Sequence, residues 1–337
     1  MSPASSPILD VRELSVQFPI HGGILGRRTG AVRAVDGVSF AVRRGKTFGL
    51  VGESGCGKTT IGKSIINILE AEIAGQVHFA RTDGDAACDL RALTRREMLS
   101  YREHIQMVFQ DPYSSLNPRL TVQEIVEEPL RVHRPAMLRD ERESHVAALL
   151  GKVGLRPDQA DRYPHEFSGG QRQRIGVARA LATSPALIVL DEPVSALDVS
   201  IQAQTVNLLQ DLQDELALSY VFIAHDLSIV EHMSDDLGVM YLGDLVERGP
   251  AREIYKNPAH PYTKALLSAV PRPDPEHKRP QRIILQGDVP SPMAKPSGCP
   301  FRTRCWLAEP ACAVAKPPLI EVSPGRFAAC PIVAKSG

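Results

Sequence analysis

One segment constrains the fold of this chain more than any other, residues 52–59, which match the pattern G-x-x-x-x-G-K-[ST]. Glycines in this pattern let backbone N–H groups approach phosphate oxygens closely. Residues 46–51 predict a strand entering the loop, and residues 60–69 predict a helix whose positive dipole end faces the phosphates. The sequence therefore predicts a site for ATP or GTP, formed by Gly52, Glu53, Ser54, Gly55, Cys56, Gly57, Lys58, Thr59 and Thr60.

Within this phosphate loop two side chains have expected roles. Lys58 would reach the β- and γ-phosphates, and the hydroxyl of Thr59 would hold Mg²⁺. A helix N-terminus could lower the thiol pKa of Cys56, but a small residue that simply fits the loop is the preferred interpretation.

Composition indicates a globular protein without an overall preference for nucleic acid. The 337 residues allow about two domains. With 39 basic and 39 acidic residues the net charge is zero, so no general field attracts nucleic acid or an anionic membrane. No apolar run approaches the roughly 20 residues that span a bilayer, and residues 1–7 lack the regions of a signal peptide. We therefore expect a cytoplasmic location, with any membrane role exercised by docking to another chain.

Strand and helix patterns alternate along the chain, which favours a parallel α/β sheet. Residues 8–18 alternate as an edge strand does, and a Gly- and Arg-bearing loop is expected over residues 19–32. Residues 81–96 predict a polar surface insertion, residues 105–109 a short apolar strand, and residues 186–190 and 220–224 two strands buried on both faces. Residues 111–182 predict a helix-rich segment, and residues 251–337 a proline-dense C-terminal unit.

Asp191 and Glu192 follow the apolar run 187–190 directly. Because ligands bind at the carboxyl ends of strands in α/β sheets, we expect Asp191 in the Mg²⁺ shell. Glu192 is then placed to polarise the attacking water as a general base. The alternative is a strand that ends in a solvated acidic turn, and the phosphate loop favours the functional interpretation.

Residues 168–171 read Ser-Gly-Gly-Gln at a predicted helix start, where backbone N–H groups can bind an anion. In the order phosphate loop, Gln110, residues 168–171, Asp191 with Glu192, and His225, the chain resembles the ATP-binding cassette (ABC) ATPases. Their signature is Leu-Ser-Gly-Gly-Gln, and Phe167 stands here at its first position. The resemblance implies that the signature grips the nucleotide of a partner cassette through Ser168, Gly169, Gly170 and Gln171.

The resemblance also implies a fold. It is a P-loop NTPase cassette with a RecA-like mixed sheet core, an antiparallel β subdomain and a helical signature subdomain at about residues 111–182. The nucleotide-binding domain would cover residues 1–250, followed by a small Cys-rich extension over residues 251–337.

Further roles are implied residue by residue. Gln110 would contact Mg²⁺ and water and link to membrane subunits, and His225 would contact the γ-phosphate. Asp198 belongs to a loop along the dimer interface, and Phe18 would stack on adenine, unless it is an ordinary core aromatic. Because Glu192 and His225 are both present, we expect a site that hydrolyses ATP, which speaks against a purely structural cassette.

Four segments resemble the oligopeptide/dipeptide importer branch, and most closely its F-type ATPase subunits: the inserted loop 19–32 before residues 34–40, and residues 108–118, 162–171 and 260–267. The resemblance implies a peripheral position at the cytoplasmic face of the membrane. It implies as partners a D-type ATPase subunit in a heterodimer, two permease chains and an extracytoplasmic peptide-binding protein. The alternatives are an importer of nickel or another solute, or a soluble ABC ATPase acting on nucleic acid or ribosomes, which the neutral charge and single cassette disfavour.

Four of the six cysteines cluster near the C-terminus: Cys299, Cys305, Cys312 and Cys330. In a reducing cytosol such a cluster favours metal or redox chemistry over disulfides. The wide gaps suit paired zinc knuckles poorly, so a [4Fe–4S] cluster is the first expectation, with zinc and free thiols as alternatives.

Overall fold

The computed structural model describes residues 6–22, 27–111, 113–270 and 282–333. Several predictions fall partly outside these ranges. They concern residues 1–5 of the N-terminus, residues 23–26 of the expected loop, Pro112, and residues 271–281 and 334–337 of the expected extension.

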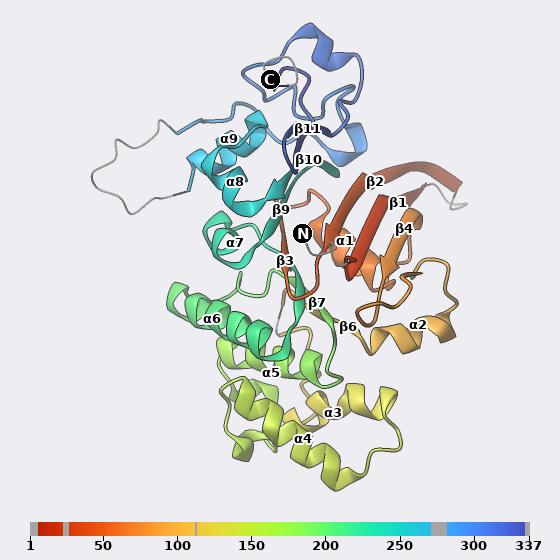
Figure 1. The fold of residues 1–337 in the computed structure, drawn as a ribbon, viewed down its shortest axis with the longest axis vertical. Helices are drawn as coiled ribbons and strands as arrows, with labels where there is room; N and C mark the ends of the chain where they lie inside the picture. Colours follow the sequence, from red (N-terminus) through yellow and green to blue (C-terminus); the bar gives the residue numbers. More distant parts are fainter. Residues whose placement is uncertain (1–5, 23–26, 112, 271–281, 334–337) are drawn as a thin grey trace.

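Two sheets organise the described chain (Figure 1). The smaller is antiparallel, with the order β2-β1-β4-β5, and the larger has the order β11-β12-β10-β9-β3-β8-β7-β6. The strands are β1 Leu9–Gly22, β2 Arg27–Val42, β3 Thr47–Val51, β4 Glu72–Phe79, β5 Cys88–Asp89, β6 Ile105–Val108, β7 Leu187–Asp191, β8 Ser219–Ile223, β9 Asp236–Tyr241, β10 Asp244–Pro250, β11 Ile320–Ser323 and β12 Arg326–Ala328.

The parallel centre of the large sheet confirms the predicted buried strands. Strands β3, β7 and β8 are buried at every position and pair in parallel, as continuous apolar runs require. Their carboxyl ends therefore point to one edge of the sheet, where the predicted site residues follow.

Helices cover the sheets and form a separate layer at one end. Helix α1 contacts β7 and β8 of the large sheet and β2 of the small one. The name C-terminal segment is used below for residues 251–270 and 282–333. Figure 1 shows α3, α4 and α5 gathered at the end of the molecule opposite this segment. The helices are α1 Lys58–Ile65, α2 Arg95–Arg102, α3 Val122–His133, α4 Arg139–Lys152, α5 Gly169–Leu181, α6 Val199–Leu216, α7 Leu227–Met233, α8 Ala251–Lys256 and α9 Pro261–Ser268, with 3₁₀ turns at Pro157–Gln159, Pro164–Glu166, Pro292–Ala294 and Pro310–Ala313.

The loop expected over residues 19–32 was wrong for most of its length. Strands β1 and β2 continue as an antiparallel pair, in which Pro19 lies opposite Ala31 and Ile20 opposite Gly30. Backbone pairing between the two strands extends both elements although this segment lacks a clear apolar alternation. The expected surface insertion over residues 81–96 is mostly exposed, and it contains β5 and the start of α2.

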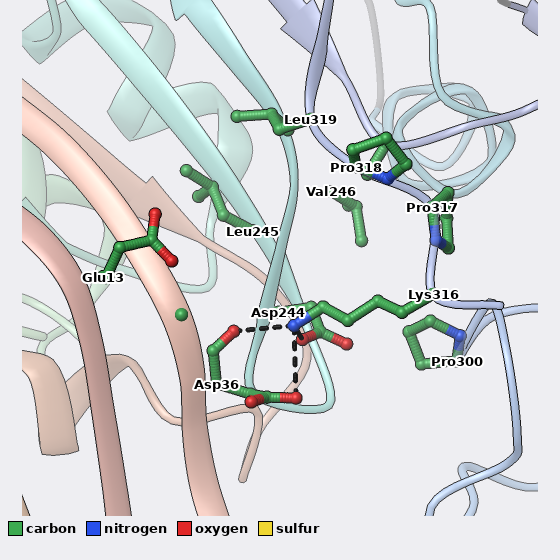
Figure 2. A pocket seen from close by; sticks show the side chains of 12 residues that line it. Glu13, Asp36, Asp244, Leu245, Val246, Pro300, Lys316, Pro317, Pro318 and Leu319 are labelled. Carbon is green, nitrogen blue, oxygen red and sulfur yellow. Dashed lines mark hydrogen bonds and ion pairs between the residues drawn. The ribbon is translucent and has the colours of Figure 1, made fainter. Parts of the chain in front are cut away.

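The C-terminal segment is joined to the cassette through the sheet. Strand β12 pairs with β10, and β11 pairs with β12, so residues 320–328 extend the large sheet. Figure 2 shows Lys316 of this segment reaching Asp36 and Asp244, with Nζ 3.1 Å from Asp36 Oδ2 and 2.7 Å from Asp244 Oδ1. Lys295 lies 2.6 Å from the other oxygen of Asp244, so two lysines neutralise this buried carboxylate.

In the part of the chain that the structure describes, no helix combines the length and apolar character needed to cross a membrane.

Candidate active site

The phosphate loop connects β3 to α1 at the carboxyl edge of the large sheet. Two of its glycines are required by their surroundings. A Cβ atom at Gly52 would lie 2.3 Å from the carbonyl oxygen of Met240, and one at Gly57 would lie 2.3 Å from that of Ala34. Both residues also have positive φ, at 153° and 106°, so the loop path depends on glycine at these positions.

Lys58 is buried inside the loop, as its predicted role requires. Its ammonium donates to the carbonyl oxygens of Gly52, at 2.7 Å, and Glu53, at 3.1 Å. Phosphate oxygens would compete for the same three N–H donors. Cys56 is buried beside it, and burial raises the pKa of its thiol, in agreement with the interpretation of a small residue that fits.

Two of the three residues predicted to contact Mg²⁺, Thr59 and Asp191, are distant in the sequence and contact each other directly in the structure. The hydroxyl of Thr59 donates to Oδ1 of Asp191 at 2.8 Å. Asp191 is buried at the end of β7, and burial raises the pKa of its carboxyl group, with the charge of Glu192 adding to the effect. A hydroxyl and an incompletely compensated buried carboxylate are hard oxygen donors, so these residues fit Mg²⁺.

Glu192 lies at the centre of a second group of predicted site residues. Its Oε2 accepts a hydrogen bond from Nε2 of Gln110 at 2.9 Å and lies 3.3 Å from Nδ1 of His225. Gln110 follows β6 and His225 follows β8, on either side of β7. The backbone of Glu192 has φ of 46°, in the left-handed region that a glutamate rarely adopts, and strain of this kind is concentrated at functional sites.

The signature residues lie apart from this site. Ser168 caps α5: its hydroxyl accepts from the N–H of Gln171, whose side chain accepts from the N–H of Ser168. Among the described residues, no hydrogen bond or ion pair joins residues 168–171 to residues 52–59. Asp198 starts α6 and is exposed, while Phe18 is half-buried on β1 opposite Val32.

Two residues of the C-terminal segment reach the phosphate loop, and the sequence analysis assigned neither a role. Arg304 binds both carboxylate oxygens of Glu53, and the hydroxyl of Tyr262 accepts from the N–H of Glu53. The segment 260–267 carried a family resemblance, but no sequence signal links Arg304 to a residue 251 positions earlier.

The four C-terminal cysteines lie close together without forming a metal site. Burial raises the pKa of Cys299 to about 11, and the other three thiols add to this through their charges. All four are free thiols. Within the described ranges, no group of three or more His, Cys, Asp or Glu side chains is arranged to hold a metal ion, so the expected cluster or zinc site does not fit the side chains as they lie.

Comparison with known proteins identifies the family. Residues 35–195 match the family model of the ABC transporter, and residues 246–312 match that of the oligopeptide/dipeptide transporter C-terminal region. The oligopeptide transport ATP-binding protein AppF of Bacillus subtilis is 51% identical, over 96% of each chain. OppF proteins of Salmonella typhimurium and Escherichia coli are each 52% identical, over 93% of this chain and 92% of theirs. The chain belongs to the ATP-binding proteins of ABC transporters.

The predicted resemblance and the ABC ATPase fold are both confirmed by these relatives and by solved structures. The protein cbiO1 of Clostridium perfringens, part of the transporter complex cbiONQ, has a TM-score of 0.60 at 26% identity and covers 74% of this chain and 91% of its own. The dimeric cassette MJ0796, in a post-hydrolysis state with ADP and Pi, has a TM-score of 0.62 at 26% identity and covers 72% and 99%.

Proposed function

We propose that this ABC protein is the ATP-hydrolysing subunit of an oligopeptide importer, bound to the cytoplasmic face of the membrane. The observation that carries the proposal is the Gln110–Glu192–His225 group beside the Thr59–Asp191 pair. This group belongs to a chain that is about half identical to oligopeptide transport ATP-binding proteins over nearly its whole length.

The site residues divide the work of hydrolysis between them. The phosphate loop and Lys58 bind the phosphates and orient the terminal phosphoryl group. When bound at Thr59, Asp191 and Gln110, Mg²⁺ supplies positive charge that stabilises the phosphate oxygens. Glu192 orients the attacking water and accepts its proton, while Gln110 and His225 hold the Glu192 carboxylate in place.

A second cassette is required to complete the site, because the signature lies apart from the phosphate loop of its own chain. An exposed Val199, 81% accessible, next to Asp198 is consistent with a partner surface there. A cavity of about 380 Å³ adjoins the signature and is lined by two arginines, Arg156 and Arg174, which suits a partner's bound phosphates. We propose a D-type ATPase as this partner, in a heterodimer.

An apolar groove beside Gln110 is the proposed docking site for a cytoplasmic segment of a permease chain. The groove, of about 290 Å³, has an apolar lining that includes Ile68, Phe109, Pro129 and Val132. Its polar lining residues are Arg102, Gln106, Glu128, His133 and Arg179. Ile68 and Val132 are exposed large apolar side chains, 41% and 52% accessible. Since Phe109 precedes Gln110, an occupant of the groove would sit next to the catalytic group. Two permease chains and an extracytoplasmic peptide-binding protein complete the proposed importer.

Peptide is favoured over nickel or another solute as cargo because the matching relatives are named as oligopeptide transport proteins. The neutral charge gives no support to a soluble ABC ATPase acting on nucleic acid. The proposal also divides the chain into a nucleotide-binding domain at residues 1–250 and an extension at residues 251–337. It assigns Phe18 to stacking on adenine and Asp198 to the dimer interface.

The four C-terminal cysteines are the proposed site of a [4Fe–4S] cluster, with zinc as the alternative. Support comes from the proximity of the four thiols, because the other three cysteines all contribute to the raised pKa of Cys299. Their side chains would have to rearrange on binding, since they do not form a metal-holding group as they lie. Metal analysis of anaerobically purified protein tests this: iron with sulfide supports the cluster, zinc supports the alternative, and metal-free protein contradicts both.

Purification from the source cell in mild detergent, followed by mass spectrometry of the accompanying chains, tests the importer assignment. We expect two permease chains and a second ATPase to accompany the protein. Recovery with ribosomes or nucleic acid, and without permeases, would contradict the proposed function.

A further inference from the structure

We infer that Arg304 and Tyr262, both in the C-terminal segment, position the phosphate loop for ATP by holding Glu53. The inference deepens the proposed function and rests on it, since it assigns the C-terminal segment a part in nucleotide binding. Both residues act through Glu53 and are positioning residues of the ATP site.

The first contact is a charged one. Nη1 of Arg304 lies 2.9 and 3.1 Å from the two carboxylate oxygens of Glu53. The Arg304 side chain is only 9% accessible and that of Glu53 27%, so water screens this pair less than an exposed one. Glu53 carries the only acidic side chain in residues 52–59. Without Arg304, this negative charge would stay unpaired in the loop that binds the polyphosphate.

The second contact fixes the loop backbone. The hydroxyl of Tyr262 accepts a hydrogen bond from the N–H of Glu53 at 3.0 Å. The ring of Tyr262 is fully buried between Tyr241 and Phe301, with ring centroids 4.8 and 5.3 Å away. Burial raises the pKa of this phenol, so it stays a hydroxyl at physiological pH. The N–H of Glu53 is therefore directed to a rigid acceptor, which sets the start of the loop.

Attachment of the segment does not depend on Arg304. Strand β12 pairs with β10, Lys295 and Lys316 pair with Asp36 and Asp244, and Arg326 reaches the buried Glu247. Loss of Arg304 should therefore alter the phosphate loop while the segment stays docked. The Arg304–Glu53 pair is therefore a local contact between two parts of one folded unit.

The test measures ATP affinity of the full-length chain with Mg²⁺ by calorimetry, and steady-state ATPase kinetics. Arg304→Gln should raise the Kd and KM for ATP about tenfold, with kcat within twofold, because neither Arg304 nor Glu53 contacts the Gln110–Glu192–His225 group in the described structure. Glu53→Gln should lower the Kd about threefold, since the positive charge of Arg304 beside the loop is then no longer neutralised. The double variant should fall between the two single variants, and Arg304→Lys should recover part of the affinity.

Tyr262→Phe removes only the acceptor and should raise the Kd about threefold. The matched control is Arg302→Gln, because this partly exposed arginine of the same turn binds Ser297 and makes no hydrogen bond to the loop. Thermal unfolding of every variant checks the fold. If Arg304→Gln unfolds, the Glu53→Gln and Tyr262→Phe affinities carry the test.

Two results would overturn the inference: unchanged ATP affinity in a folded Arg304→Gln variant, or a double variant no tighter than Arg304→Gln. If Arg304→Gln does not fold, unchanged ATP affinities of both Glu53→Gln and Tyr262→Phe would overturn the inference. Failure of the proposed function is distinguishable from these, because it would show as wild-type protein that binds ATP but is not recovered with permeases.

Discussion

In the proposed site, side chains that follow the two strands flanking β7 contact the carboxylate that follows β7. Gln110 and His225 both contact Oε2 of Glu192, and the Glu192 backbone adopts a left-handed conformation to present it. A carboxylate held on two sides keeps one orientation, which favours a defined position for the attacking water. The neighbouring pair of Thr59 and Asp191 is where Mg²⁺ would bind.

Replacement of Glu192 by glutamine should separate ATP binding from hydrolysis. The amide keeps the shape of the side chain but cannot accept the proton of water, so the rate should fall about 10²- to 10⁴-fold. Phosphate release and ATP affinity measure the two effects. Glu231→Gln, an exposed carboxylate on α7, is the control. Hydrolysis at the wild-type rate would show that Glu192 is not the base.

Acid should destabilise the protein through His260. Burial lowers the pKa of His260 to about 3, while its Nδ1 accepts from the N–H of Tyr262. The unfolded chain binds this proton near pH 6.5, so stability is lost as the pH falls from about 6.5 toward 3. From this residue alone we expect a loss of about 2 kcal/mol between pH 7 and 4.5.

Urea unfolding at several pH values checks this expectation. In His260→Asn, which retains an acceptor for the cap, the decline over this pH range should be smaller than in the wild type. An identical decline in both proteins would assign the acid sensitivity to other groups.

At the scale of elements, the helical layer and the large sheet meet at the groove beside Gln110. The groove is bounded by the end of α1, strand β6 and helix α3, so an occupant would touch both layers at once. Movement of the helical layer against the sheet could then be transmitted to Gln110 and Glu192 through β6.

Val132→Asp should uncouple the subunit from its permease. A charge at this apolar position of the groove disfavours docking of an apolar segment, while Val132 is exposed enough for the fold to accept it. We expect unchanged ATPase activity of the isolated chain, and recovery of permease chains reduced more than tenfold in a pull-down. Leu138→Asp, at the start of α4 and 68% exposed, is the matched control. Equal recovery with both variants would place the docking site elsewhere.

The sequence predicted the elements that carry local signals. Residues 52–59 fix their own turn chemistry, and the apolar runs that became β7 and β8 need no partner information to read as buried strands. The continuation of β1 and β2 through Pro19 and Gly30 was missed because it depends on pairing between strands. The approach of Arg304 to Glu53 was missed for the same reason, since it depends on how the C-terminal segment packs against the rest of the chain.

At the scale of the whole molecule, the C-terminal segment belongs to the folded unit. It contributes strands to the large sheet, two lysines to buried Asp244, and Arg326 to Glu247, which is fully buried. The Glu247 carboxylate also accepts from the N–H groups of Ala259 and His260, so it ties α9 to β10. Damage to this network should therefore affect the stability of the cassette.

Arg326→Met should lower the free energy of unfolding by about 3 kcal/mol, because it leaves the Glu247 carboxylate buried without its cation. Urea denaturation measures the loss. Arg302→Met removes a partly exposed arginine of the same segment that binds Ser297 and not a carboxylate, so it should change stability by less than about 1 kcal/mol. Comparable stability of both variants would contradict a stabilising role for the Arg326–Glu247 pair.

The most direct measurement of the proposed function is peptide uptake into proteoliposomes that contain this subunit, its partner ATPase and two permease chains. With the peptide-binding protein on one side and ATP on the other, we expect oligopeptide to accumulate only while ATP is hydrolysed. The same assembly with Glu192→Gln should bind ATP and transport little or no peptide. Wild-type hydrolysis without uptake of any peptide, in an assembly that retains all its chains, would contradict peptide import as the function.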